Sequence, residues 1–185
     1  TFTNAAGTAA LAPVTLRNTS ELRFDYSTGL LATNRLEGYG GQGRWDDDTA
    51  VVLNNSTIRL LGNRDIEVTE TVGDVTVGKF GQLVPQRDLL NRTVTLVVGG
   101  GAGNDITRQT QTNNGLAIAG NVGTLQINPA NGTQLGSDER VKLFSGMGAN
   151  GIGALGGVTN GMVAPWIVNG GEFQFLTYTA ANGFV

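Results

Sequence analysis

Apolar side chains recur at every second residue of this chain, in short runs that end at Gly, Asn or Asp. Such alternation places one face of an extended strand in a core and leaves the other face in water. The 3.6-residue periodicity of an amphipathic helix is nearly absent. The sequence therefore predicts an all-β fold of about ten or more short strands. The expected strands are residues 14–17, 21–24, 57–60, 66–69, 75–77, 93–98, 116–118, 124–127, 141–144 and 172–175.

The breaks between these runs are turn-forming dipeptides, which suit the high glycine content of 29 residues. Gly and Asn tolerate the positive φ angles that tight turns require. The expected turns lie at residues 54–55, 62–63, 73–74, 99–101, 120–121, 131–132 and 170–171. The chain is therefore divided into many short strands by frequent polar corners.

Two all-β architectures compete for this pattern. A sandwich or barrel favours aromatic core anchors and two-residue hairpins, but aromatic residues make up only 6% of the chain. A β-solenoid needs only a few small aliphatic side chains from each coil, because stacked neighbours complete the core. Residues 56–60 align with 123–127, and loosely with 92–96, without a strict period. We therefore expect a right-handed parallel β-helix with degenerate coils.

The composition excludes several kinds of chemistry. The chain has no His and no Cys, so it offers no Ser-His-Asp triad, thiol nucleophile, disulfide or Cys/His metal site. Its net charge of −3 argues against binding to nucleic acid, which requires a basic patch. No apolar run approaches the about 18–20 residues of a membrane span. The chain lacks an initiating Met, and we expect it to be a segment of a longer polypeptide.

Three stretches resemble the autotransporter-associated β-strand repeat proteins. They are Leu53–Asn63, Glu70–Val77, and Thr159–Tyr178 with the following Asn182-Gly183, which includes the most specific block, around Pro165-Trp166. The matches lie within residues 51–185, and residues 1–50 match less clearly. The bulky Gln174-Phe175-Leu176 departs from the small residues usual in the family. We expect one continuous domain, with N-terminal coils over 1–50 and the repeat solenoid over 51–185.

The resemblance implies a role as well as a fold. The family consists of long, secreted, right-handed parallel β-helices of bacterial passenger domains and giant surface proteins, which act as spacers, display rods, adhesins or fibres. Its repeats share no catalytic residues. The resemblance therefore implies a non-enzymatic structural segment at the bacterial cell surface, whose partners are copies of itself or adjacent repeats. A filament assembled end to end follows as a hypothesis.

Acidic residues in two corners are weak candidates for a Ca²⁺ site. Asp46, Asp47 and Asp48 are adjacent and follow a glycine-rich stretch, and Ca²⁺ takes six to eight oxygen ligands. Asp105 belongs to Gly100–Thr107, which is close to one copy of a Ca²⁺-binding nonapeptide. That motif works in tandem, and adjacent strand residues face opposite sides, so a solvated turn is the competing interpretation for both. No other cofactor is expected.

Two further functions remain open. Trp45 and Tyr39 could stack on surface glycans in a carbohydrate-binding or adhesin module, with corner packing as the alternative for Trp45. A polysaccharide lyase or hydrolase would need two carboxyl groups that face one glycosidic bond. Glu67 and Glu70 lie three residues apart on a strand pattern and are expected to face opposite sides. We therefore expect no enzyme activity.

Overall fold

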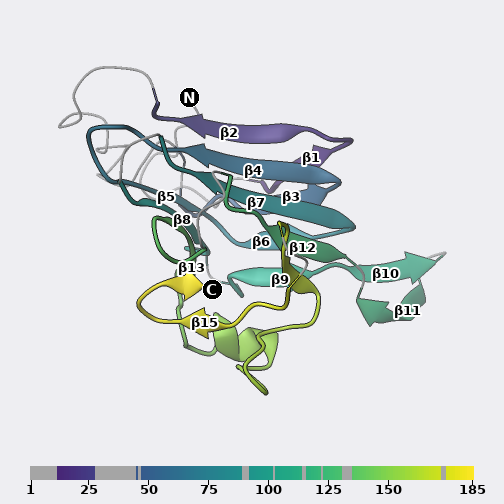
Figure 1. Ribbon diagram of the computed structural model, residues 1–185. Coiled ribbons are helices and arrows are strands. Elements are labelled where there is room, and N and C mark those ends of the chain that lie inside the picture. Colours follow the sequence, from purple (N-terminus) through teal and green to yellow (C-terminus); the bar gives the residue numbers. More distant parts are fainter. Residues whose placement is uncertain are drawn as a thin grey trace.

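The computed structural model describes residues 12–27, 45, 47–88, 92–101, 103–113, 116–121, 123–130, 135–171 and 174–185, with the backbone alone for 110–121. Within this part the predicted all-β fold is confirmed, because the described chain forms strands and a single short 3₁₀ helix, η3 (Ile152–Leu155) (Figure 1).

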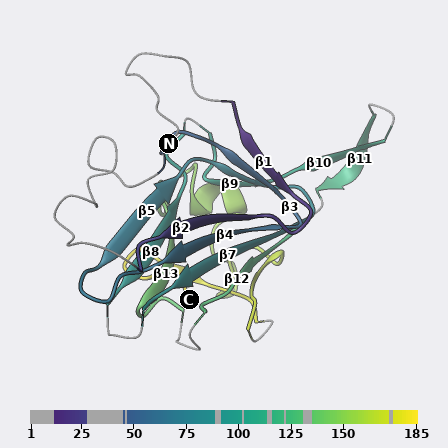
Figure 2. The same cartoon turned by 90° about the horizontal axis from the view of Figure 1, so that it is seen from above.

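Three sheets of parallel strands surround the core. Sheet A has the order β1-β3-β6-β9, sheet B has β14-β12-β7-β4-β2, and sheet C has β13-β8-β5. Seen from above, they lie on three sides of the interior (Figure 2). The strands of sheet A are β1 (Val14–Arg17), β3 (Val51–Asn54), β6 (Val75–Val77) and β9 (Ile106–Arg108). Those of sheet B are β2 (Glu21–Asp25), β4 (Ser56–Leu61), β7 (Phe80–Gln86), β12 (Thr124–Ile127) and β14 (Ile167–Asn169). Those of sheet C are β5 (Val68–Val72), β8 (Val94–Val98) and β13 (Glu139–Leu143).

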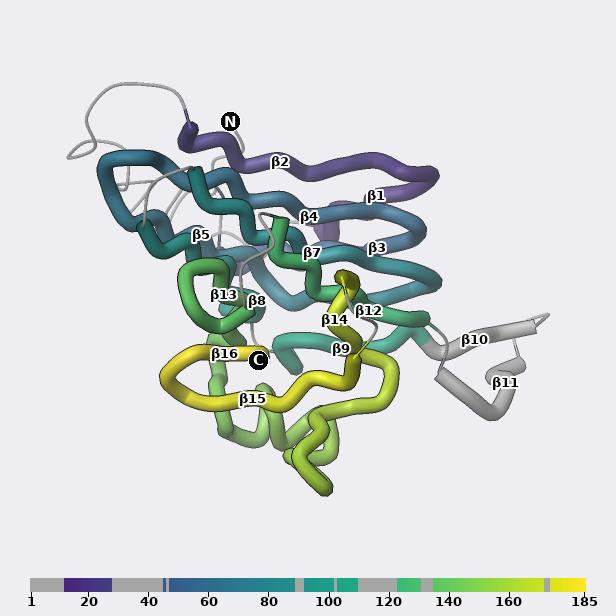
Figure 3. The backbone as a smooth tube through the Cα atoms, in the orientation of Figure 1, coloured from purple at the N-terminus to yellow at the C-terminus, as the bar shows by residue number. Residues whose placement is uncertain are grey.

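The chain passes through sheets A, B and C in turn, and we call each such run a rung. The rungs are β1-β2, then β3-β4-β5, then β6-β7-β8, and finally β9-β12-β13. The rungs lie above one another, as the backbone trace in Figure 3 shows. Each strand pairs with the corresponding strand of the next rung; Ile58, for example, is in register with Leu22 and Leu83, and Leu83 with Ile127.

The core is built from aliphatic columns that follow this register. Every second strand residue points inward, so Val51, Val75 and Ile106 form one column, each at most 2% exposed. Because each residue is covered by its counterparts in the rungs on either side, two or three small aliphatic side chains per strand suffice to exclude water. A single core runs through the rungs.

Residues 144–185 form a different structure at one end of the stack, which we call the cap. It contains η3, β14 and the antiparallel pair β15 (Tyr178–Thr179) and β16 (Gly183–Phe184). A second antiparallel pair, β10 (Thr110–Asn113) and β11 (Leu116–Asn121), projects from the side of the stack between β9 and β12 in both ribbon views.

The predicted strands agree with the structure to different degrees. The boundaries expected for 14–17, 75–77 and 124–127 are those of β1, β6 and β12. The strand expected at 66–69 begins two residues later, at Val68, and the turn expected at Gly120-Asn121 lies inside β11. Residues 174–175 make only an isolated bridge, Phe175 to Val168. Residues 131–132 and 172–173 lie outside the described part.

Candidate functional site

Asp105, one of the predicted acidic residues, lies at the corner that precedes sheet A, together with Asp74. Asp74 and Asp105 come directly before the paired residues Val75 and Ile106, so they occupy equivalent positions in successive rungs. The glycine-rich segment 99–103 passes over this corner, where the Gly103 N–H donates to Asp74 Oδ2 at 3.0 Å. At Gly100, whose φ is +140°, a Cβ atom would lie 2.7 Å from the carbonyl oxygen of Asp47. Glycine is therefore required for the segment to approach so closely.

Asp105 is used within the chain. It is 1% exposed, and its carboxylate accepts hydrogen bonds from the Ser145 N–H at 2.7 Å and the Ser145 hydroxyl at 2.9 Å. Its own N–H donates to the Asn150 carbonyl at 2.9 Å. Burial raises the pKa of Asp105 above 3.8, the two bonds from Ser145 oppose this shift, and the charge of Asp74 adds to it. Asp105 thus ties the fourth rung to the cap.

Of the other proposed Ca²⁺ ligands, Asp48 is exposed and Asp47 is half-buried, and Asp46 lies outside the described residues. Within the described part of the chain, no three His, Cys, Asp or Glu side chains are grouped as a metal site requires.

Trp45 occupies the corner-packing position and is not an exposed sugar contact. Its side chain is only 9% exposed and belongs to the core. The ring packs edge-to-face on Phe24 at 5.8 Å between centroids, and its Nε1 donates to the Thr49 carbonyl at 3.3 Å. With 9% of its surface exposed, Trp45 has little area available for stacking on a sugar ring. Tyr39 lies outside the described residues.

Two buried carboxylates, Glu70 and Glu139, connect corners to sheet C. Glu70 is 0% exposed; it accepts hydrogen bonds from the Tyr26 hydroxyl and, at 2.9 Å, from the Trp45 N–H. Glu139 is also 0% exposed and accepts from the Arg87 N–H at 2.7 Å. Both occupy strand positions whose register partners are apolar, so no motif marks them. Glu67 is exposed whereas Glu70 is buried, so these two carboxyl groups do not face a common bond.

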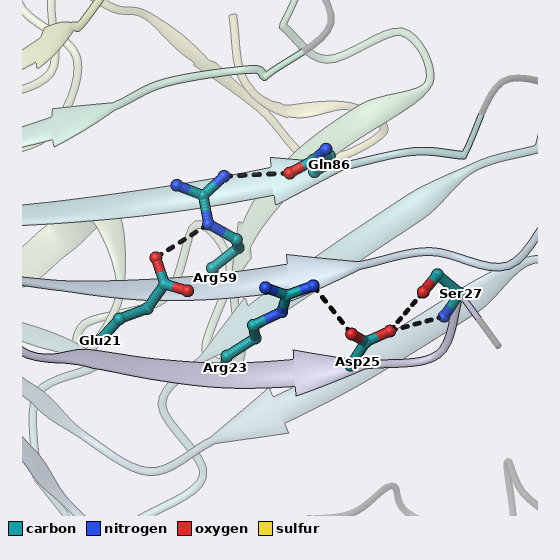
Figure 4. A network of polar contacts seen from close by, with 6 residues as sticks. All are labelled: Glu21, Arg23, Asp25, Ser27, Arg59 and Gln86. Atoms are coloured by element: carbon teal, nitrogen blue, oxygen red, sulfur yellow. Dashed lines mark hydrogen bonds and ion pairs between the residues drawn. The ribbon is translucent and has the colours of Figure 1, made fainter.

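The outer face of sheet B carries polar contacts that run from rung to rung (Figure 4). The Arg59 guanidinium in the second rung donates to Glu21 of the first at 2.9 Å and to Gln86 of the third at 3.0 Å. Beside it, Thr57 donates to Gln82 at 3.2 Å and Gln82 to Gln126 at 3.0 Å. These contacts fix the register of four successive strands.

A smaller network of polar side chains lies at the end of β2. Arg23 forms an exposed ion pair with Asp25 at 2.9 Å. The Ser27 hydroxyl and N–H donate to Asp25 at 2.5 and 3.0 Å, and these bonds, with the nearby Arg23 charge, lower the pKa of Asp25 below 3.8. These contacts join residues at the end of the first rung to one another.

The cap covers every sheet at the C-terminal end of the stack. In sheet A, the Asp105 N–H bonds to Asn150. In sheet B, β14 pairs with β12, and the Asn169 N–H on its far side donates to the Gln174 carbonyl at 2.9 Å. In sheet C, the Leu143 N–H donates to the buried Tyr178 hydroxyl at 3.0 Å. The described part of the stack therefore has one covered end.

The opposite end of the stack is different. β1 and β2 each pair on one side only, with β3 and β4, and no other strand of the described chain pairs with their outer edges. Val14, Leu16 and Leu22 of this first rung pack against the core but remain partly exposed, whereas Phe24 is buried. An outer backbone edge beside partly exposed core residues is the surface on which a further rung would stack.

Comparisons with known proteins return no match: no family profile, curated protein or solved structure is similar to the chain. In the described part of the chain, no helix has the length and apolar character needed to cross a membrane.

Proposed function

We propose that this chain is a right-handed parallel β-helix segment of an extracellular bacterial surface or fibre protein, in which it acts as a rod or spacer. Parallel pairing in all three sheets, with successive strands of the chain placed in successive sheets, supports the β-helix. Parallel crossover connections are right-handed in nearly all proteins. The resemblance of residues 51–185 to secreted β-strand repeat proteins supports the location and role.

One observation carries the mechanical role. Within the described residues, the backbone ladder is covered at its C-terminal end, and no strand pairs with the outer edges of β1 and β2. A solenoid end with free N–H and C=O groups binds another strand readily. The open end is completed by a further rung, either from the adjoining part of the same polypeptide or from another copy. The covered end stops the ladder in the other direction.

The hydrogen bonds of β2 show which substitution would test association at the outer edge of this strand. The Ser20 carbonyl and the Tyr26 N–H bond to the second rung. Because successive residues of a strand direct their backbone groups to opposite sides, the N–H of Arg23 points to the open edge. Arg23→Pro removes this donor without removing a bond to β4, and Arg23→Ala is the matched control that keeps the donor.

Sedimentation of the isolated chain at increasing concentration is the direct test. If copies stack through this end, the wild type and Arg23→Ala associate, whereas Arg23→Pro associates much less. Equal association of all three variants contradicts stacking at this edge.

Antibodies against the chain should also label intact cells that produce the protein, and labelling only after the cells are broken would contradict the surface location.

A further inference from the structure

The cap contains four described Asn-Gly pairs, which begin at Asn150, Asn160, Asn169 and Asn182. In an Asn-Gly pair the backbone nitrogen of the glycine can attack the asparagine side chain, because glycine has no side chain to hinder the approach. The reaction replaces the asparagine amide by a carboxylate. Since all four pairs have the same sequence, the fold decides which of them reacts.

Two of the glycine nitrogens are held by hydrogen bonds and by close packing. The Gly151 N–H donates to the Gly148 carbonyl at 3.2 Å, and the Gly170 N–H donates to a carbonyl of β12 at 2.9 Å. A Cβ atom would lie 2.3 Å from the Gly146 carbonyl oxygen at Gly151, and 3.0 Å from Asn128 at Gly170. The attack requires the nitrogen to leave its hydrogen bond and the glycine to turn, so both features oppose it.

The third glycine, Gly183, is held in the β15–β16 pair. Thr177 and Val185 donate to each other's carbonyls at 2.9 and 3.1 Å. Bonded and non-bonded pairs alternate along antiparallel strands, so Thr179 and Gly183, two residues further along each strand, are again a bonded pair. The close approach to the Val141 carbonyl oxygen also leaves Gly183 no room to turn.

The pair Asn160-Gly161 differs from the other three in both respects. The two residues form the exposed turn between Thr159 and Met162, whose backbone groups bond to each other at 2.8 and 3.0 Å. The Gly161 N–H lies between these bonds and has no hydrogen-bond acceptor among the described residues. Apart from its chain neighbours, no atom lies within 4 Å of the position of a Cβ on Gly161. The nitrogen is therefore unbonded and the space around it is open.

The shape of this turn requires the reactive sequence. The φ angles of Asn160 and Gly161 are +51° and +78°. Positive φ at both central residues is the pattern of a type I′ turn, for which Asn-Gly is a strongly preferred sequence. The residues that form the turn best are thus also a pair that can react with each other.

We propose that Asn160 is a site of spontaneous deamidation in the folded chain. The Gly161 nitrogen attacks Asn160 Cγ, a bond forms between these two atoms, and the bond from Cγ to Nδ2 breaks. Nδ2 leaves as ammonia with the proton of the Gly161 N–H, and a cyclic imide remains. Water then opens the imide at Cγ to give aspartate, or at the backbone carbonyl to give isoaspartate. Either product adds a negative charge to the cap.

Isoaspartate alters the turn more than aspartate does. Its main chain runs through Cβ and Cγ and is one atom longer, so the turn no longer matches the two bonds between Thr159 and Met162. The next residue, Val163, is buried, and its N–H donates to the Leu176 carbonyl at 2.9 Å. The reaction therefore acts where the exposed turn joins the buried part of the cap. It is independent of stacking at the first rung.

Incubation of the full chain in mildly alkaline water enriched in a heavy oxygen isotope tests the proposal. Water enters when the imide opens, so each residue that reacts during the incubation carries the label, and later reaction in ordinary water does not. The two methionines, Met147 and Met162, allow cyanogen bromide to release residues 148–162 and 163–185 as separate fragments. Mass spectrometry of these fragments then locates the label.

The relative rates decide the outcome. Label should appear at Asn160 about tenfold faster, or more, than at Asn150, Asn169 and Asn182, because their glycine nitrogens are released only while a hydrogen bond is open. An unlabelled Asn160 in the folded chain, or equal rates at the four positions, overturns the proposal.

A denaturing concentration of urea separates the effect of the fold from that of the sequence. All four pairs are then exposed, so their rates should become similar and the preference for Asn160 should disappear. The same preference in urea would overturn the assignment to the folded turn. Asn160→Gln is the matched variant, because it keeps an amide but requires a larger ring. It should abolish the label at this position and leave the rates at the other three pairs unchanged.

Discussion

The role of Asp105 in the structure differs from the role that its sequence context predicts. In the sequence it belongs to a glycine-rich segment similar to a Ca²⁺-binding repeat. In the structure it is buried and accepts both hydrogen bonds from Ser145. Its position before β9 makes it the link between the last rung and the cap. Burial of a carboxylate has a free-energy cost that depends on pH.

Asp105→Asn should reveal that cost. Because the pKa of Asp105 is raised in the folded state, the native protein binds the proton more tightly than the unfolded chain. The associated stability is fully present below the ordinary pKa of 3.8 and is lost as the pH rises through the native pKa. The free energy of unfolding of the wild type relative to Asp105→Asn should therefore increase as the pH falls from neutral. Urea titrations at several pH values measure it, and a constant or opposite difference would refute the assignment.

At the scale of elements, the cap depends on a close crossing of β16 over β13. Gly183 has a φ of +77°, and a Cβ atom there would lie 2.1 Å from the Val141 carbonyl oxygen. The crossing therefore requires glycine for two separate reasons, backbone conformation and space. Gly161 has nearly the same φ, +78°, but no atom lies near its Cβ position.

This pair of glycines separates the two requirements. Gly161→Ala should cost about 1–2 kcal/mol, from the left-handed backbone alone. Gly183→Ala should cost at least about 1 kcal/mol more, because the methyl group also collides with backbone. Chemical unfolding of both variants tests this, and equal losses would mean that β16 moves away from β13 without penalty.

The strands that sequence reasoning found are those with clean alternation. β7 was missed, although it pairs on both sides, because Gly81 and Pro85 interrupt its pattern. Gly81 is explained by the stack, since a Cβ there would lie 2.8 Å from Leu53.

The alignment of residues 56–60 with 123–127 identified two strands of one sheet, but its register was two residues off: Ile58 and Ile127 both align with Leu83. Residues 92–96 belong mainly to another sheet, because alternation does not encode which sheet a strand joins.

At the scale of the whole molecule, the rungs form a nearly one-dimensional stack. Each rung contacts mainly the rungs beside it, so stability is expected to vary along the axis. The cap protects the fourth rung, while the first has a neighbour on one side only in the described chain. Local opening should therefore begin at β1 and β2 and reach the central strands last.

Hydrogen exchange followed by mass spectrometry measures this gradient. Amides of β7 and β8 should exchange most slowly, those of β4 at an intermediate rate, and those of β1, β2 and the β10–β11 hairpin fastest, under conditions in which the chain is monomeric. Protection that is uniform along the stack, or lowest in the cap, would contradict a one-dimensional order of unfolding.

The candidate sites were harder to predict than the fold. Polar residues that form them come from distant positions: Tyr26 and Glu70 are 44 residues apart, and Asp105 and Ser145 are 40 apart. Their contacts arise only when the rungs are stacked in register, and the intervals between rungs are irregular. Thr57 and Gln82 are 25 residues apart, whereas Gln82 and Gln126 are 44 apart. Without a constant period, the sequence could not show that Trp45 is packed against Phe24.

The covered end of the stack has a consequence for polymer growth. A unit with one self-complementary contact yields dimers and nothing longer. With the cap closing one end, head-to-tail polymerisation through the ladder is blocked. Two chains that meet through their first rungs would therefore form a dimer with a cap at each outer end, and neither cap would accept a third chain.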